Sequence, residues 1–264
     1  MTPIALLVIQ FGLIAAGVVV AWVVSHRRLP APWSAIGWGV LAFPLSQVAR
    51  MALMIPAGMG LTAWLGAGSA ALTTASLVLA VLTSGLFEEG TRWIVMRYWA
   101  KGVRAWREGV AFGLGHGGIE AILVFGIATV TGAVLLTVPD LITSTVGASA
   151  PEQSAALAAQ IQALQHLTPA DLVPGIWERA LAVTFHVVCS LVVLQSVRTR
   201  RPVLLLLAMA LHCGFNAIAV TAAAQLGSPV VVELVLTACV APLVWVVLRG
   251  PLSRRRVDGD AVPA

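Results

Sequence analysis

A short charged stretch within an apolar segment is the part of this sequence best suited to chemistry. Residues 85–92 read Gly-Leu-Phe-Glu-Glu-Gly-Thr-Arg, which sets Glu88, Glu89 and Arg92 among Leu, Ala, Val and Thr residues. Inside a bilayer a charged side chain costs at least ~2.5–3.5 kcal/mol, so such a cluster indicates a functional site. Glu88 and Arg92 are four residues apart and can pair on one helix face. A buried ion pair that only holds helices together is the competing interpretation.

Three later apolar segments also contain polar groups. In the Gly-rich stretch 112–120, His116 and Glu120 are four residues apart, so both face one side of a helix. His186 follows Phe185 in the next segment, and His212 and Asn216 form another pair with a spacing of four. Taken singly, each histidine is as well explained by a hydrogen bond between helices, and the glycines by close helix packing.

Depth in the membrane links these groups. Counted at ~1.5 Å per residue from the basic residues that end their segments, all lie within roughly 12–18 Å of one membrane face. Catalytic zinc takes three protein ligands and keeps an open position for water, and a nearby carboxylate serves as general base. We therefore expect a zinc site whose ligands come from His116, Glu120, His186 and His212. Either Glu88 or Glu89 is then the base, and the common HExxH motif is absent from the sequence.

The composition places the chain in a membrane. Of its 264 residues, 59% are hydrophobic and only 10% are charged, against roughly 25% charged in soluble domains. The net charge of +5 does not indicate nucleic-acid binding, because the basic residues cluster at the ends of apolar segments. The three cysteines lie within such segments, so no disulfide is expected.

The apolar runs predict an all-α, polytopic transmembrane helix bundle. Seven segments are long enough to span a bilayer: 3–25, 34–57, 67–97, 108–138, 176–197, 202–226 and 229–248. We expect one helical domain over residues 1–250 and a disordered, basic tail over 251–264. The loop 139–175 is expected to be extracytoplasmic and to contain a helix at 152–166, either interfacial or an ordinary connection.

The basic residues predict the orientation. Lys and Arg follow the first, third, fifth and seventh segments, and the loops 58–66, 139–175 and 227–228 contain none. By the positive-inside rule, the N-terminus lies outside and the C-terminus is cytoplasmic. The protein is expected in the cell membrane as a multi-pass protein, with the inner or plasma membrane of a bacterium favoured.

Four further charged residues lie within the segments or near their ends. Arg50 lies within the second segment, and Glu120 and Glu178 are its candidate partners. Glu178 and Arg179 are expected to form a pair at the outer end of the fifth segment. Glu233, near the outer end of the seventh segment, is expected to be solvated.

Taken together, the four motifs resemble those of the intramembrane metalloproteases of the CAAX-protease and bacteriocin-processing (CPBP) group, and most closely its YhfC-type branch. The resemblance rests on Glu88-Glu89-x-x-Arg92, the Gly-rich stretch with His116 and Glu120, Phe185-His186, and His212-x-x-x-Asn216, over residues 80–220. It implies that a glutamate activates water to attack a peptide carbonyl inside the bundle. Glu88 matches the family's base, while His116, His212 and Asn216 match residues that orient metal or water.

One departure from the broader family concerns the first motif. That family has three residues between the glutamate pair and the arginine, whereas this chain has two, Gly90 and Thr91. The spacing leaves open whether Glu88 or Glu89 is the base. Glu88, Glu89, Arg92 and Asn216 are accordingly all predicted to be catalytic.

The sequence thus predicts a zinc-dependent intramembrane peptidase that acts on a membrane protein or a lipidated peptide. Two alternatives remain. A proton- or metal-coupled transporter also uses buried Glu and His residues, although no inverted repeat is seen. A non-catalytic scaffold or immunity protein could have the same fold.

Overall fold

The computed structural model describes residues 1–149 and 151–259, and within these ranges the chain is helical with no β-strand. Among the described residues, seven helices are long and apolar enough to cross a membrane, which confirms the predicted number of spans. The elements are α1 (Pro3–Arg28), α2 (Trp33–Leu65), α3 (Ala70–Ile94), η1 (Val95–Trp99), α4 (Trp106–Thr137), α5 (Pro139–Ser149), α6 (Pro151–Gln165), η2 (Pro169–Asp171), α7 (Leu172–Thr199), α8 (Pro202–Gln225), α9 (Pro229–Leu248) and α10 (Arg254–Gly259).

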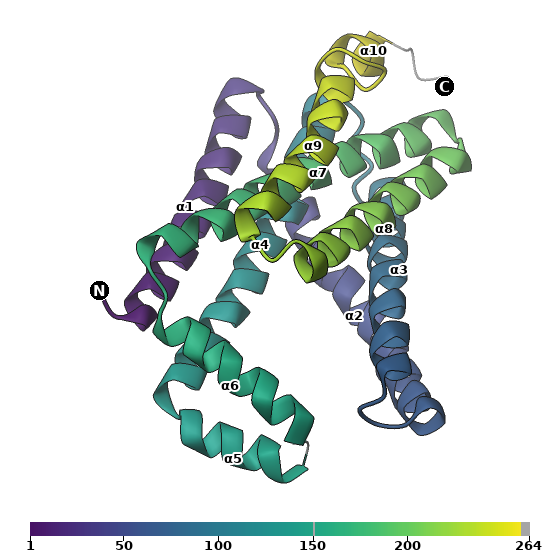
Figure 1. Ribbon diagram of the computed structural model, residues 1–264. Coiled ribbons are helices and arrows are strands. Elements are labelled where there is room, and N and C mark those ends of the chain that lie inside the picture. The colour runs from purple at the N-terminus through teal and green to yellow at the C-terminus, as the bar shows by residue number, and fades with distance from the viewer. Residues whose placement is uncertain (150, 260–264) are drawn as a thin grey trace.

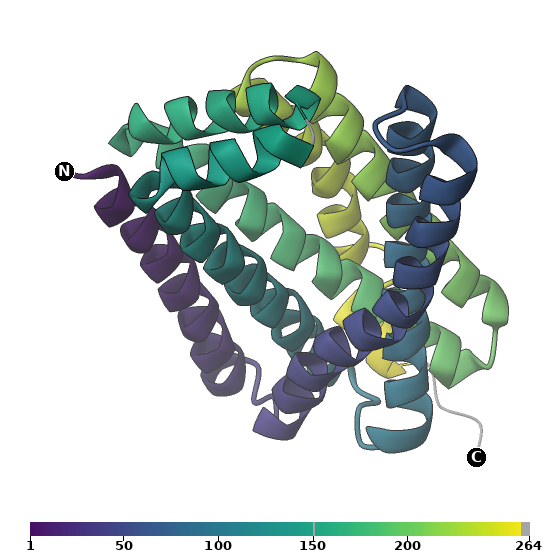
Figure 2. The same cartoon turned by 90° about the horizontal axis from the view of Figure 1, so that it is seen from below.

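Helix α7 lies at the centre of the bundle, with α4 packed beside it. Helix α4 packs against α1, α2 and α7, while α7 also contacts α3, α8 and α9. In α7, 67% of the most apolar window is buried, compared with at most 22% in the other spans. The other spans therefore present much of their apolar surface outward, as helices in lipid do, and α7 is the interior helix (Figures 1 and 2).

Local sequence signals explain the helix ends. The hydroxyl of Ser69 accepts a hydrogen bond from Leu72 N (3.1 Å) and caps α3. Glu108 accepts from the backbone N–H groups of Arg104 (2.7 Å) and Ala105 (2.8 Å), which fixes the start of α4. Between α8 and α9, Gly227 has φ +61, a left-handed conformation that glycine adopts without strain.

The loop between α4 and α7 contains more helix than expected. Helix α6 corresponds to the predicted helix at 152–166, and α5 and η2 were not predicted. Figure 1 shows α5 and α6 at one end of the bundle, together with the α2–α3 connection, and α10 at the opposite end. The orientation of these ends across a bilayer stays a prediction.

The expectation of a disordered tail from residue 251 is wrong for residues 254–259, which form α10. Val257 of this helix is fully buried. The Trp106 backbone N–H donates to Asp258 (2.7 Å), and its indole N–H donates to Leu252 O (2.9 Å). These contacts with the start of α4 order the segment, and residues 260–264 lie outside the described residues.

Candidate active site

Glu89 and Arg92 form an ion pair at the centre of the bundle. Arg92 Nη1 donates to both carboxylate oxygens of Glu89, at 2.7 and 2.6 Å, and both side chains are fully buried. The expected pairing of Arg92 with Glu88 is therefore wrong. Arg92 lies three residues after Glu89 and four after Glu88, so either carboxylate could reach it along the helix. Arg92 binds Glu89, and Glu88 contacts groups on α2 and α4.

Glu88 is buried without a cationic Lys or Arg partner among the described residues. Its Oε1 accepts from Gln47 Nε2 on α2 (3.2 Å). Its Oε2 lies 3.2 Å from His116 Nε2 on α4 and 3.9 Å from His212 Nε2 on α8. Glu88 is thus a carboxylate surrounded by histidines, whereas Glu89 is bound to a guanidinium.

The hydrogen bonds assign different roles to the two nitrogens of His212. Nδ1 lies 2.7 Å from Glu89 Oε1. The carboxylate of Glu89, paired with Arg92, can only accept, so Nδ1 carries the hydrogen and Nε2 is an acceptor in the neutral ring. A carboxylate behind a histidine is the arrangement that orients metal-ligating histidines.

His186 has a partner at each ring nitrogen. Arg92 Nη2 lies 3.1 Å from Nδ1, and because an arginine only donates, Nδ1 accepts. Nε2 then carries the hydrogen, and it lies 2.5 Å from Glu120 Oε2. His186 therefore links Arg92, and through it Glu89, to Glu120. The other oxygen of Glu120 lies 3.8 Å from Arg179 Nη1.

The glycines of α4 allow this close assembly. A Cβ at Gly113 would lie 2.5 Å from Val187 Cα on α7, and one at Gly117 would lie 2.9 Å from His186 Cβ. On another side of α4, a Cβ at Gly118 would lie 2.6 Å from Val18 Cγ1 on α1. Any larger residue would push α1 or α7 away, so the close-packing interpretation is confirmed and places His116 beside His186.

The site opens into a small cavity of about 90 Å³. Its lining residues include Glu88, Glu120, His186, His212 and Asn216. Asn216 Nδ2 donates to Ser84 Oγ (2.8 Å), which fixes the orientation of the amide. All four polar motifs of the sequence therefore meet at one place, with side chains from α3, α4, α7 and α8.

The donor set suits a transition metal. Ligand atoms of Glu88, His116, Glu120 and His186 lie within 4.8 Å of one another, and so do those of Glu89, His186 and His212. Imidazole and carboxylate are ligands that zinc accepts, at about 2.0–2.2 Å. In addition, His116 Nδ1 is buried without a hydrogen-bond partner among the described atoms.

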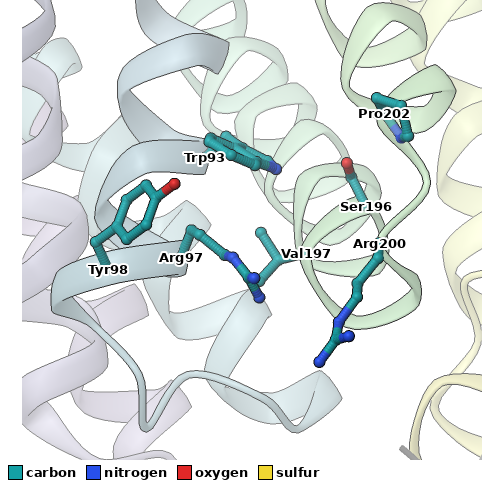
Figure 3. A pocket seen from close by; sticks show the side chains of 7 residues that line it. All are labelled: Trp93, Arg97, Tyr98, Ser196, Val197, Arg200 and Pro202. Carbon is teal, nitrogen blue, oxygen red and sulfur yellow. The ribbon is translucent and has the colours of Figure 1, made fainter. Parts of the chain in front are cut away.

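A second cavity, of about 230 Å³, lies between η1 and the α7–α8 connection. Figure 3 shows Arg97 and Arg200 with Trp93 and Tyr98 around it. Its lining includes no carboxylate and no imidazole. It therefore offers no carboxylate or imidazole as a metal ligand or general base.

The structure adds residues that the motifs did not single out. Gln47 bonds Glu88, and Arg50 lies one turn further along α2. Arg50 bonds Gln47 Oε1 (3.3 Å), Thr83 Oγ1 (3.1 Å) and Ala80 O (2.8 Å). The expectation that Arg50 pairs with Glu120 or Glu178 is wrong, because polar groups on α2 and α3 are nearer. Only the polarity of Gln47 in an apolar segment could have drawn attention to it.

Fold and site together define a polytopic helical membrane protein with a buried Glu/His/Arg centre between four helices. The family model of the YhfC intramembrane metalloproteases matches residues 11–236, most of the chain. The chain therefore belongs to the YhfC intramembrane metalloprotease family, a family of membrane peptidases.

A curated relative supports the same family. The chain is 36% identical over 145 residues to the uncharacterized membrane protein YhfC of Bacillus subtilis (strain 168). The match covers 53% of this chain and 54% of that protein, so the chain spans about half the length of the relative. No solved structure matches.

Proposed function

We propose that this protein is a zinc-dependent intramembrane peptidase and that Glu88 is its general base. The observation that carries this proposal is the different environment of the two glutamates. Glu89 is bound to Arg92 by two short hydrogen bonds, whereas Glu88 lines the cavity and faces His116 and His212. A carboxylate already paired with arginine is a weaker proton acceptor, so Glu88 is better suited to accept a proton from water.

The metal ligands in this proposal are His116 and Glu120, whose ligand atoms lie within 4.8 Å of each other, together with His212 from the second group. His116 Nε2 and His212 Nε2 lie 3.2 and 3.9 Å from the same oxygen of Glu88. His212 presents Nε2 to the cavity because Glu89 holds Nδ1. His186 is left out of the ligand set, because Arg92 and Glu120 occupy its two nitrogens, and it positions Glu120. When bound there, zinc would polarise the substrate carbonyl and increase the acidity of water.

The chain's own residues then complete the reaction. Glu88 accepts a proton from the attacking water as the water oxygen bonds to the peptide carbonyl carbon. The C–N bond then breaks, and Glu88 returns the proton to the leaving amine. Asn216, held by Ser84, has a second amide hydrogen with which it can stabilise charge on the carbonyl oxygen.

The substrate proposed is a membrane protein or a lipidated peptide. The site is built by four membrane-spanning helices and its principal side chains are buried. A substrate segment must therefore be apolar enough to enter the bundle, which a soluble peptide is not.

The proposal can be tested without knowing the substrate. New N-termini of membrane proteins are compared by mass spectrometry between cells that express the wild-type chain and cells that express Glu88→Gln. We expect cleavage products only with the wild type. Equal folding of the two proteins, measured by thermal unfolding in detergent, is the control. Identical sets of N-termini would defeat the peptidase proposal, and bound zinc in both proteins would then favour a non-catalytic role.

A further inference from the structure

A large acidic cavity lies beside the site. Its volume is about 500 Å³, and it is bounded by residues of α1, α4, η2, α7, α8 and α9. We call it the acidic vestibule, because its lining includes Asp171, Glu178 and Glu233 but no Lys, Arg or His. The α8–α9 connection borders the acidic vestibule. In Figure 1 this connection faces the end of the bundle where α5 and α6 lie.

The acidic vestibule adjoins the small cavity at Glu88. Three residues, Glu178, Ala219 and Leu236, line both cavities. These residues of α7, α8 and α9 form a wall common to the two cavities. The vestibule therefore lies directly beside the cavity of the Glu/His centre.

Glu233 is a carboxylate of the vestibule that lacks a hydrogen-bond donor at one oxygen among the described atoms. Its side chain lines the vestibule and is only 4% exposed, so the expectation that it is solvated is wrong. Its Oε2 is buried without a hydrogen-bond partner among the described atoms. A buried carboxylate oxygen without a donor is costly, which a bound cation or N–H donor would remedy.

The other two acids differ from Glu233. Asp171 is exposed, and its carboxylate accepts from Thr168 N (2.8 Å) and Thr168 Oγ1 (2.6 Å), so it serves to cap the local turn. Glu178 pairs with Arg179, as expected from the sequence, but Arg179 also approaches Glu120. Arg179 therefore serves both Glu178 and Glu120 of the active site.

We propose that the acidic vestibule is the substrate's path to Glu88 and that Glu233 and Glu178 there bind a cationic side chain of the substrate. This rests on the proposed peptidase function and adds a substrate class, a membrane segment flanked by Lys or Arg. A lysine or arginine has an apolar stem suited to Leu236 and a charged end that meets the unpaired Glu233.

Charged thiol reagents test this without any proteolysis. Ala223, an exposed residue of α8 that lines the vestibule, is changed to Cys in a chain with Cys213→Ala and Cys239→Ala. Cys189 is retained because it is fully buried. The labelling rates of cationic trimethylammonium-ethyl and anionic sulfonatoethyl methanethiosulfonate are then compared at low salt.

Ala67→Cys, in the exposed turn between α2 and α3, is the matched control for intrinsic reactivity. We expect the cationic-to-anionic rate ratio to be about tenfold higher at Ala223→Cys than at Ala67→Cys. Adding Glu233→Gln or Glu178→Gln should lower it towards the control. Ala219→Cys, at the junction of the cavities, provides a second position if the first variant misfolds. Equal ratios at the vestibule and the control would overturn the proposal.

A peptide pair tests the substrate class. A 20-residue Leu/Ala helix with one Lys near its end should slow labelling at Ala223→Cys, and the same peptide with Gln should not. Equal protection by both peptides would overturn the assignment of a cationic substrate. Because neither experiment measures cleavage, failure here is distinguishable from failure of the peptidase proposal, which depends on Glu88→Gln.

Discussion

The ion pair between Glu89 and Arg92 can be tested by removing its charges singly and together. Arg92→Met removes the cation but leaves the Glu89 carboxylate, whose exposed fraction is 0%, with only the donor from His212. Breaking a buried pair in this way costs about 3–5 kcal/mol. Glu89→Gln leaves the guanidinium of Arg92, also 0% exposed, without its counter-charge and should cost a similar amount.

The double variant Glu89→Gln, Arg92→Met has neither buried charge and keeps an amide oxygen that can accept from His212. It should therefore be more stable than the sum of the single changes predicts, with a coupling of about 2–3 kcal/mol. The free energy of unfolding is measured in mixed detergent micelles as SDS is added. The fluorescence of the nine tryptophans reports unfolding.

Arg97→Met is the control, because Arg97 is only half-buried and has no carboxylate within 4 Å among the described residues. Its cost should stay within about 0.5 kcal/mol. Two results would refute the reasoning: an Arg92→Met cost no greater than that of Arg97→Met, or a double variant whose loss equals the sum of the single losses.

Two further predictions concern metal binding and packing. Purified protein should contain about one zinc per chain. His116→Ala or His212→Ala should abolish zinc binding. His166→Ala is the control and should not, because His166 is exposed between α6 and η2. Elemental analysis measures this, and metal-free wild type would exclude the zinc site. Gly113→Ala should destabilise by about 1–3 kcal/mol because its Cβ would meet Val187 Cα at 2.5 Å. Gly12→Ala, with nothing within 4 Å, should be neutral or stabilising by up to about 1 kcal/mol in the same unfolding assay.

Much of the fold could be predicted because the bilayer imposes simple rules. Apolar runs of sufficient length must be helices, and the structure has a helix at each of the seven predicted segments. The common depth of four residues predicted that they would lie together: Glu88, His116, His186 and His212. A polar group in lipid must find polar partners at its own level, so groups at one depth converge.

Three features of the structure depend on contacts between segments that are distant in the sequence. Arg92 can reach both Glu88 and Glu89 along its own helix, and the choice depended on groups from α2 and α4 that attract Glu88. The burial of Glu233 likewise depends on how α9 packs beside α7. In α10, contacts with Trp106, from a distant segment, hold a charged run against the start of α4. None of these outcomes has a local signal.

The glycine contacts of α4 determine which parts of the bundle can move. Helices α1 and α7 lie so close to the α4 backbone that sliding α4 along either one would drive backbone into side chains. Helices α8 and α9 are peripheral to α4 and border the vestibule instead. Local opening should therefore occur at α8 and α9, and the amide hydrogens of α4 around residues 113–118 should exchange with solvent most slowly in the molecule.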